Sequence, residues 1–277
     1  MSKLKPAIAT AILLIVSALG HAQPQPQPQQ PQARTAPKQT KPAPTAKPSI
    51  VLVHGAWADG SCWDKVVPLL EAKGYSVVAL HLPLTTPAED IAATTRAIER
   101  QPGDVVLVGH SYAGFVISRA GHDAKVKALV FVDAFGLDDG ETVNALLKDK
   151  PPAWLKALQV DSGGYAWLSK ETVMNDFAPD VSAAEQKLIL AKQGPVPVKG
   201  FDEAMKDPAW KSKPSWYVRG TRDRIIDPSA QAMFAKRMKA KTTTIDAGHV
   251  GMLSKPKAVA DVILDAATAR PATAASK

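Results

Sequence analysis

The stretch Asp104-Val-Val-Leu-Val-Gly-His-Ser-Tyr-Ala-Gly-Phe-Val-Ile-Ser-Arg119 decides the fold of this chain of 277 residues. The apolar run at 105–108 is short and rich in β-branched residues, which is typical of a strand buried on both faces. The next residues predict a turn so tight that Ser111 adopts a strained backbone conformation, and residues 115–120 have helical spacing. A strand, a sharp turn with a central serine and a helix together indicate a nucleophile elbow.

Two small residues flank the serine at the spacing that such an elbow requires. Gly109 lies two positions before Ser111 and Ala113 lies two positions after it, so that strand and helix can approach closely. The usual pattern has glycine at both places, so Ala113 is a departure, and Gly114 follows it. An ordinary strand-to-helix loop is the alternative, but the strand before the turn and the helix after it favour a nucleophile.

Strands and helices alternate on both sides of the elbow, which predicts an α/β domain with a mostly parallel six-stranded sheet flanked by helices. We expect strands at 50–53, 75–80, 105–108, 126–132, 215–219 and 242–246, and helices at 61–73, 87–100, 115–120, 228–239 and 255–268. The alternation stops at about 137–213, where Pro151-Pro152 and Gly163-Gly164 interrupt helix-like pieces. We interpret this segment as a helical cap inserted over the sheet, with an independent second domain as the alternative.

The residues before Ser49 have the composition of an export signal followed by a linker. Residues 1–22 join two lysines to an apolar run too short to span a bilayer, which predicts a signal peptide cleaved after Ala22; an uncleaved anchor is the alternative. Residues 23–48 are rich in Pro and Gln and predict a disordered linker. We therefore expect a periplasmic or secreted protein with one domain at 49–270 and a flexible tail at 271–277.

The charge of the chain gives little support to a nucleic-acid partner. The formal net charge is +8, but six of the 34 basic residues precede Ser49, where there is no acidic residue. Cys62 is the only cysteine, which excludes an intramolecular disulfide. The sequence has no metal-ligand cluster, phosphate loop or dinucleotide motif, so we expect no metal and no cofactor. We also expect no stable membrane insertion after signal cleavage, and either a monomer or a homodimer.

Candidates for the other catalytic groups follow Ser111 along the chain. A serine needs a base to take its proton, and the base needs an acid to hold its tautomer. His249 is the candidate base because it lies in the loop after the last strand. Asp223 and Asp227 are candidate acids; Asp227 precedes Pro228 at a helix start and has a capping role, which favours Asp223.

Two backbone N–H groups are the candidate oxyanion hole. In an elbow of this kind one N–H comes from the residue after the nucleophile, here Tyr112. The second comes from the loop after the strand at 50–53, here Ala56, and Gly55 lets that loop pass close to the reacting carbonyl.

Four segments carry a resemblance to a known family. They are Val51-Leu-Val-His-Gly-Ala-Trp57, Trp63-Asp-Lys-Val-Val-Pro-Leu-Leu70, Gly109-His-Ser-Tyr112 and Gly248-His-Val-Gly-Met-Leu-Ser-Lys-Pro256. They resemble the α/β-hydrolase superfamily, and within it the branch of small bacterial carboxylesterases, plant methyl-ester esterases and hydroxynitrile lyases. The resemblance implies an α/β-hydrolase fold and a cofactor-free Ser-Asp-His site under a helical cap, with the acid at Asp223.

The resemblance also separates the candidate functions. Plant hydroxynitrile lyases of this branch have Thr at the place of Gly55 and Lys at the place of Val250, so ester hydrolysis by a serine carboxylesterase is favoured over a lyase-like activity. A hydrolase-fold ligand-binding protein with slow turnover is a further alternative. Trp57, Trp154 and Trp167 are candidate pocket residues and suggest a small to medium, hydrophobic ester, although core packing explains aromatic residues equally well.

Overall fold

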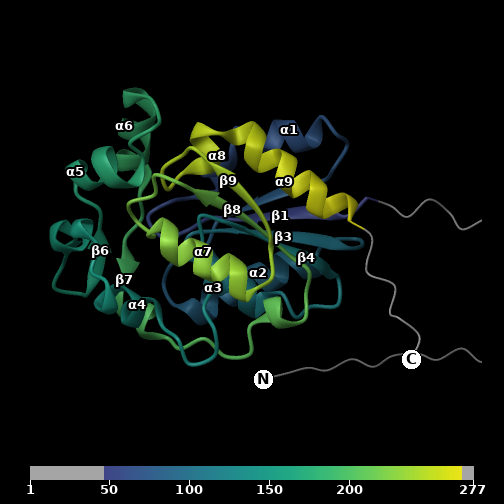
Figure 1. The fold of residues 1–277 in the computed structure, drawn as a ribbon, viewed down its shortest axis with the longest axis horizontal. Helices are drawn as coiled ribbons and strands as arrows, with labels where there is room; N and C mark the ends of the chain where they lie inside the picture. The colour runs from purple at the N-terminus through teal and green to yellow at the C-terminus, as the bar shows by residue number, and fades with distance from the viewer. Residues whose placement is uncertain (1–46, 270–277) are drawn as a thin grey trace, which may run out of the picture. The chain divides into compact units, whose positions relative to one another are not determined.

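A computed structural model describes residues 47–269, and its centre is a six-stranded parallel sheet (Figure 1). The strand order is β2-β1-β3-β4-β8-β9, and each neighbouring pair is parallel. The strands are β1 (Ser49–Val53), β2 (Val77–Leu80), β3 (Val105–His110), β4 (Val126–Val132), β8 (Ser215–Gly220) and β9 (Lys241–Ile245). The predicted sheet is confirmed. The predicted signal peptide, almost all of the linker and the tail lie outside the described residues.

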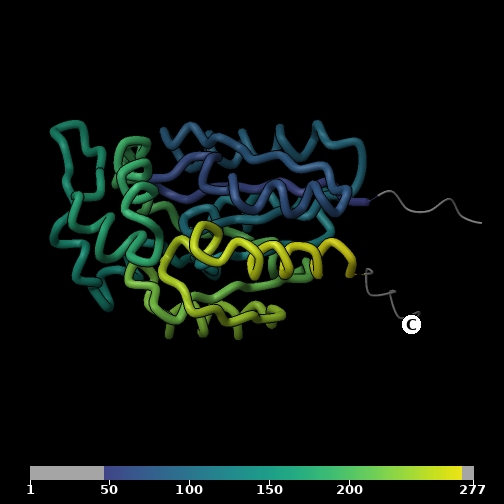
Figure 2. Tube along the Cα trace, turned by 90° about the horizontal axis from the view of Figure 1, so that it is seen from above, coloured from purple at the N-terminus to yellow at the C-terminus, as the bar shows by residue number. Residues whose placement is uncertain are grey.

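Helices cover both faces of this sheet, as the sequence pattern predicts. The helices α1 (Val67–Glu71) and α9 (Pro256–Thr268) lie on one face, and α2 (Pro87–Glu99), α3 (Ala113–Ala120) and α7 (Pro228–Arg237) lie on the other (Figures 1 and 2). Every residue of β1 and β3 is buried, which explains their unbroken apolar sequences. No helix among residues 47–269 is long and apolar enough to cross a membrane.

The register of the sheet brings its functional loops to one edge. Gly109 of β3 is opposite Val53 of β1 on one side and Phe131 of β4 on the other. Because all the strands are parallel, the loops that follow β1, β3, β4, β8 and β9 emerge at the same edge. Binding sites of open α/β sheets form at this carboxyl-terminal edge.

The helix predicted at 61–73 is wrong in its extent. The structure has a 3₁₀ turn, η1 (Gly60–Trp63), and then the short α1. Pro68 is the physical reason, because proline lacks an N–H and its ring clashes with a preceding helical turn, so it fits only at a helix start. The apolar face that the pattern predicted is still buried, with Trp63, Val66 and Leu70 fully covered.

The chain between β4 and β8 forms the cap, which lies beyond one end of the sheet (Figures 1 and 2). Its helical elements are α4 (Val143–Asp149), η2 (Ala153–Ala157), α5 (Lys170–Thr172), η3 (Val173–Phe177), α6 (Ala183–Lys192), η4 (Val198–Asp202) and η5 (Ala209–Lys211). It also contains an antiparallel sheet of β5 (Gln159–Val160), β6 (Tyr165–Trp167) and β7 (Val196–Pro197), which the sequence did not predict. Strands of two or three residues are too short to show a period of two.

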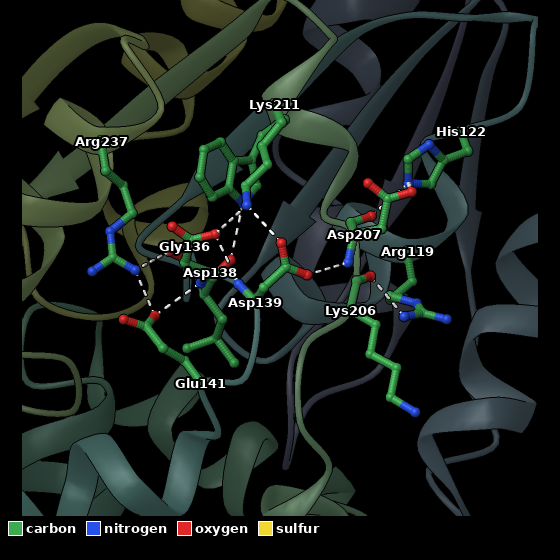
Figure 3. Close-up of polar contacts among 12 residues, drawn as sticks. Arg119, His122, Gly136, Asp138, Asp139, Glu141, Lys206, Asp207, Lys211 and Arg237 are labelled. Atoms are coloured by element: carbon green, nitrogen blue, oxygen red, sulfur yellow. Dashed lines mark hydrogen bonds and ion pairs between the residues drawn. The ribbon is translucent and has the colours of Figure 1, made fainter.

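Polar contacts close the base of the cap, where the chain leaves the core and returns to it (Figure 3). The ammonium group of Lys211 lies 2.6 Å from carboxylate oxygens of both Asp138 and Asp139. The N–H of Asp207 donates to Asp139 at 2.5 Å, and Arg119 of α3 donates to the carbonyl of Lys206 at 2.7 Å. These exposed pairs contribute little energy singly, but together they join the two ends of the cap to each other and to the core.

Candidate active site

Ser111 lies at the tip of a strand-turn-helix elbow between β3 and α3. Its φ angle is +54°, in the left-handed region, which is uncommon for a residue other than glycine. Its carbonyl accepts hydrogen bonds from the N–H groups of Gly114 and Phe135, and its own N–H donates to Val132. The β3–β4 edge and the first turn of α3 therefore hold the strained serine in place.

The glycine after the turn explains why Ala113 is tolerated. A Cβ atom on Gly114 would lie 2.1 Å from the carbonyl oxygen of Phe135, which no side chain can occupy. A Cβ atom on Gly109 would lie 2.8 Å from the carbonyl oxygen of Ala113. The close approaches that require glycine are thus at Gly109 and Gly114, while the methyl group of Ala113 packs in the core.

The structure brings Ser111, His249 and Asp223 together in one hydrogen-bonded chain. Ser111 Oγ lies 2.8 Å from His249 Nε2, and His249 Nδ1 lies 2.8 Å from Asp223 Oδ2. All three residues are buried, with His249 fully covered and Ser111 5% exposed. These three side chains lie between the sheet edge and the cap, where water is largely excluded.

The two acid candidates have separate partners. Asp223 Oδ1 accepts from the N–H groups of Ile225 and Ile226 at 2.8 and 3.0 Å, which leaves Oδ2 facing His249. Asp227 caps α7 instead, accepting from the N–H of Ser229 at 2.7 Å.

Asp227 also pairs with Lys150 at 2.6 Å, and this hydrogen bond is the main reason why the pKa of Asp227 is lowered to about 2. Asp227 is therefore occupied at the surface of its own helix, and Asp223 is the carboxylate that contacts His249.

Several residues that the sequence analysis did not select as functional support the hydrogen bonds between Ser111, His249 and Asp223. Gln231 of α7 donates to Asp223 Oδ2 at 2.7 Å, and His110 Nε2 donates to the carbonyl of His249 at 2.8 Å. Burial lowers the pKa of His110 well below its ordinary value, so this ring is neutral. No local sequence pattern marks these residues, because their partners lie on other elements.

Asp133 is a second buried carboxyl group at the same edge of the sheet. It directly follows β4 and is fully buried, and it accepts from the N–H groups of Gly220 at 2.7 Å and Gly251 at 3.3 Å. Burial, and then the charge of nearby Asp223, raises the pKa of Asp133 well above its ordinary value. Asp133 thus links the end of β8 to the loop of His249.

Ala56 and Tyr112 present backbone N–H groups at the start of the β1 loop and of α3. Among the described residues, neither N–H donates to a protein acceptor. His54 accepts from the N–H of Leu82 through Nε2, so its proton is on Nδ1, which donates to the carbonyl of Gly55 at 2.9 Å. Burial lowers the pKa of His54 to about 4, so this link persists at neutral pH.

The side chain of Tyr112 points away from the sheet edge toward α2. Its hydroxyl donates to the buried Asp90 at 3.0 Å, and the other oxygen of Asp90 accepts from the N–H of Leu84 at 2.8 Å. Burial is the main reason why the pKa of Asp90 is raised to about 6. The hydrogen bond to Asp90 therefore holds Tyr112, the residue after Ser111, in place from the side of the sheet that α2 covers.

The candidate pocket residues do not share one cavity. Trp57 lines a cavity of about 190 Å³ with Phe177 and Val250, whereas Trp154 lines a cavity of about 500 Å³ that reaches Asp223. The two indole rings pack edge-on with centroids 5.7 Å apart and lie between these cavities.

The remaining two candidates lie elsewhere. Trp167 is opposite Gln159 in the cap sheet and is not among the residues that line either cavity. Gly55 lies against the elbow, where an added Cβ atom would be 2.7 Å from that of Ser111.

The sequence of this chain matches a known family of α/β proteins. A family model described as the alpha/beta hydrolase family matches residues 50–262, and the chain belongs to this family. Pyrethroid hydrolase from Sphingobium wenxiniae is 30% identical over 250 residues, which cover 79% of this chain and 88% of that protein. Methylesterase 2 from Arabidopsis thaliana is 28% identical over 251 residues, covering 79% of this chain and 95% of that protein.

A solved structure has the same fold. Polyneuridine aldehyde esterase superposes with a TM-score of 0.70 at 23% identity, covering 79% of this chain and 99% of that one. The predicted resemblance to the α/β-hydrolase superfamily is thus confirmed. The relatives are hydrolases and esterases, which supports an α/β-hydrolase enzyme that acts on esters.

Proposed function

We propose that the protein is a serine hydrolase that cleaves carboxylic esters through an acyl-enzyme intermediate. The observation that carries this proposal is the chain of two 2.8 Å contacts from Ser111 through His249 to Asp223. Ser111 is the nucleophile, His249 is the general base and Asp223 holds the tautomer of His249 that leaves Nε2 free to accept a proton.

The reaction begins when Ser111 Oγ attacks the ester carbonyl carbon and its proton passes to His249 Nε2. The negative charge that develops on the carbonyl oxygen is stabilised by the N–H groups of Ala56 and Tyr112. The tetrahedral intermediate then expels the alcohol, which takes the proton from His249. In the second half, water gives a proton to His249 and attacks the acyl carbon. The second tetrahedral intermediate then releases the acid, and Ser111 Oγ takes the proton back from His249.

The substrate class that we propose is a small to medium ester with hydrophobic parts, bound in the smaller cavity, whose wall residue Phe177 packs against His249. The wall of the smaller cavity includes Trp57, Phe177 and Val250, and aromatic side chains supply large apolar contact areas. The relatives named as a pyrethroid hydrolase and a methylesterase are consistent with this class. A panel in which the acyl and alcohol parts vary separately, and which includes methyl esters and pyrethroids, identifies the preferred substrate.

The first test of the mechanism is the variant Ser111→Ala with p-nitrophenyl acetate as substrate. Removing such a nucleophile costs roughly 10⁴- to 10⁶-fold in turnover, so hydrolysis by Ser111→Ala is expected to be near background. A fluorophosphonate should add covalently to the wild-type protein, at Ser111 by peptide mass spectrometry. Turnover by Ser111→Ala within tenfold of wild type would contradict the proposal, and a single burst without further hydrolysis would favour a slow binding protein.

A further inference from the structure

The cap contacts the loop of His249 through a short segment, 177–180, which begins at the last residue of η3 and precedes α6. The ring of Phe177 meets the ring of His249 edge-on, with centroids 5.3 Å apart. A Cβ atom on Gly248 would lie 3.2 Å from Pro179, so the segment is close to the backbone beside the histidine. Two consecutive residues of the loop are thus covered by the same part of the cap.

Asp180 makes the polar contact within this segment. Its Oδ2 accepts the N–H of Gly248, the residue directly before His249, at 2.7 Å. Hydrogen bonds to a charged acceptor are among the stronger ones in proteins. The other oxygen, Oδ1, is buried and has no hydrogen-bond partner among the described residues, which is a costly place for a carboxylate. An acceptor is thus kept at position 180 although burying its Oδ1 atom is costly, which points to a role for the hydrogen bond that Oδ2 accepts from Gly248.

The core holds the same loop from the other side. Asp133 accepts from the N–H of Gly251, two residues after His249, and His110 donates to the carbonyl of His249 itself. Of the polar contacts to residues 248–251, only that of Asp180 comes from the cap. If the cap moves away from the sheet edge, the Gly248 N–H loses its partner while the contacts from the core remain.

We infer that Asp180 is a positioning residue that makes the placement of His249 depend on the closed cap. The inference rests on the proposed serine mechanism, in which His249 Nε2 must stay within hydrogen-bond reach of Ser111 Oγ. Closure of the cap over an ester then completes the alignment of the base as well as excluding water. An open cap leaves the loop of His249 held by the core alone.

The test compares four variants for kcat and KM with p-nitrophenyl acetate, and for the midpoint of thermal unfolding. Asp180→Ala removes the acceptor and should lower kcat roughly 10- to 100-fold, with KM within about threefold of wild type, because small misplacements of catalytic groups have effects of this size. Asp180→Asn keeps an acceptor oxygen at the same distance and should recover most of kcat. Asp180→Glu keeps the charge but displaces the carboxylate, and should remain impaired.

Asp202→Ala is the matched control, because Asp202 is an exposed carboxylate of the cap that accepts from Asn144 at 2.9 Å and lines neither cavity. It should leave kcat within about threefold of wild type. Near-normal kcat in Asp180→Ala would overturn the inference, and so would equal losses in Asp180→Ala and Asp202→Ala. High activity in Asp180→Glu together with loss of activity in Asp180→Asn would show that the charge of residue 180 matters rather than the position of its acceptor oxygen. That result would also overturn the inference.

Ser111→Ala in the same assay separates this inference from the proposed function. If Ser111→Ala keeps its turnover, the serine mechanism itself fails, whatever the Asp180 variants do. If Ser111→Ala is inactive and Asp180→Ala is fully active, the serine mechanism stands and only the role of Asp180 is wrong.

Discussion

At the scale of single residues, neighbouring carboxylates of similar sequence context have different tasks because of their partners. Asp223 and Asp227 lie four positions apart, yet one contacts His249 and the other caps α7. Asp133 is buried beside Gly220 and Gly251, and Asp90 is buried beside Leu84. Burial raises the pKa of both carboxyl groups. The chemistry of each group follows from the donors around it more than from its residue type.

The separation of the two acids predicts opposite results for two conservative variants. Asp223→Asn should lose roughly 10⁴-fold in kcat with the fold intact, because an amide stabilises the wrong tautomer of His249. Asp227→Asn should keep most of its activity, because asparagine also caps helices. Steady-state kinetics at saturating ester, with circular dichroism as the control for folding, decide between them. The opposite pattern would transfer the role to Asp227.

The buried Asp90 predicts a pH dependence of stability. Its pKa is about 6 in the folded protein and about 3.8 in the unfolded chain, so the folded state binds more protons between these values. The free energy of unfolding should therefore fall as the pH rises from about 4 to 6, and stay lower above that range. The full effect is up to about 3 kcal/mol, from about 1.4 kcal/mol per pKa unit.

Asp90→Asn removes this titration and should be more stable relative to wild type at pH 7 than at pH 4. Urea unfolding of both proteins across pH 4 to 8 measures the difference. The amide oxygen of the asparagine can still accept from Leu84, so the local fold is retained. A difference between the two proteins that does not change with pH would show that Asp90 keeps its ordinary pKa.

At the scale of elements, the elbow requires that α3 lie directly on the backbone after β4. Gly114 is the contact point, since its missing side chain leaves room for the carbonyl of Phe135. Gly114→Ala should destabilise the protein by about 1–3 kcal/mol or more, because either α3 or the 133–135 loop must move. Activity should fall as well, since Phe135 donates its N–H to Ser111.

Gly103→Ala is the matched control for this prediction. An added Cβ atom at Gly103 meets nothing within 4 Å, so the change should be nearly neutral or slightly stabilising. Chemical unfolding of both variants measures the difference. Equal stability of Gly114→Ala and wild type would mean that the elbow can relax around a methyl group.

At the scale of the whole molecule, residues 47–269 contain the complete sheet, the cap and the candidate site. The first strand begins at Ser49, whose N–H donates to the carbonyl of Asp104, and Lys47 donates to the carbonyl of Lys73. A chain that begins at Lys47 should therefore unfold at the same urea concentration as the full chain, with kcat within about twofold. A large loss in either quantity would show that earlier residues contribute to the fold.

Export of the protein is a separate proposal about the whole molecule. The composition of residues 1–22 predicts a mature protein that begins at Gln23 in a periplasmic or secreted fraction. N-terminal sequencing of the active protein from its own cells measures this directly. Protein that begins at Met1 or Ser2 would contradict it.

The sequence by itself determined the α/β class, the six strands and the elbow at Ser111, because each depends on a local pattern of a few residues. Apolar runs mark buried strands, and a serine between a strand and a helix marks the sharp turn. The sequence also selected His249 and Asp223 by their order along the chain, and the structure places His249 beside Ser111 and Asp223 beside His249. Helix limits were less accurate, as Pro68 shows, because a single residue can end a pattern that continues on either side.

Only the tertiary structure decided which groups hold these residues in place. Gln231, His110, Asp133 and Asp180 act on partners that lie between 8 and 139 positions away in the chain, so no local spacing marks them. The need for glycine at Gly114 likewise comes from Phe135 on another element. The three-stranded sheet of the cap and the absence of Trp167 from both cavities have the same origin, since contacts between distant segments arise from how the chain packs rather than from its local propensities.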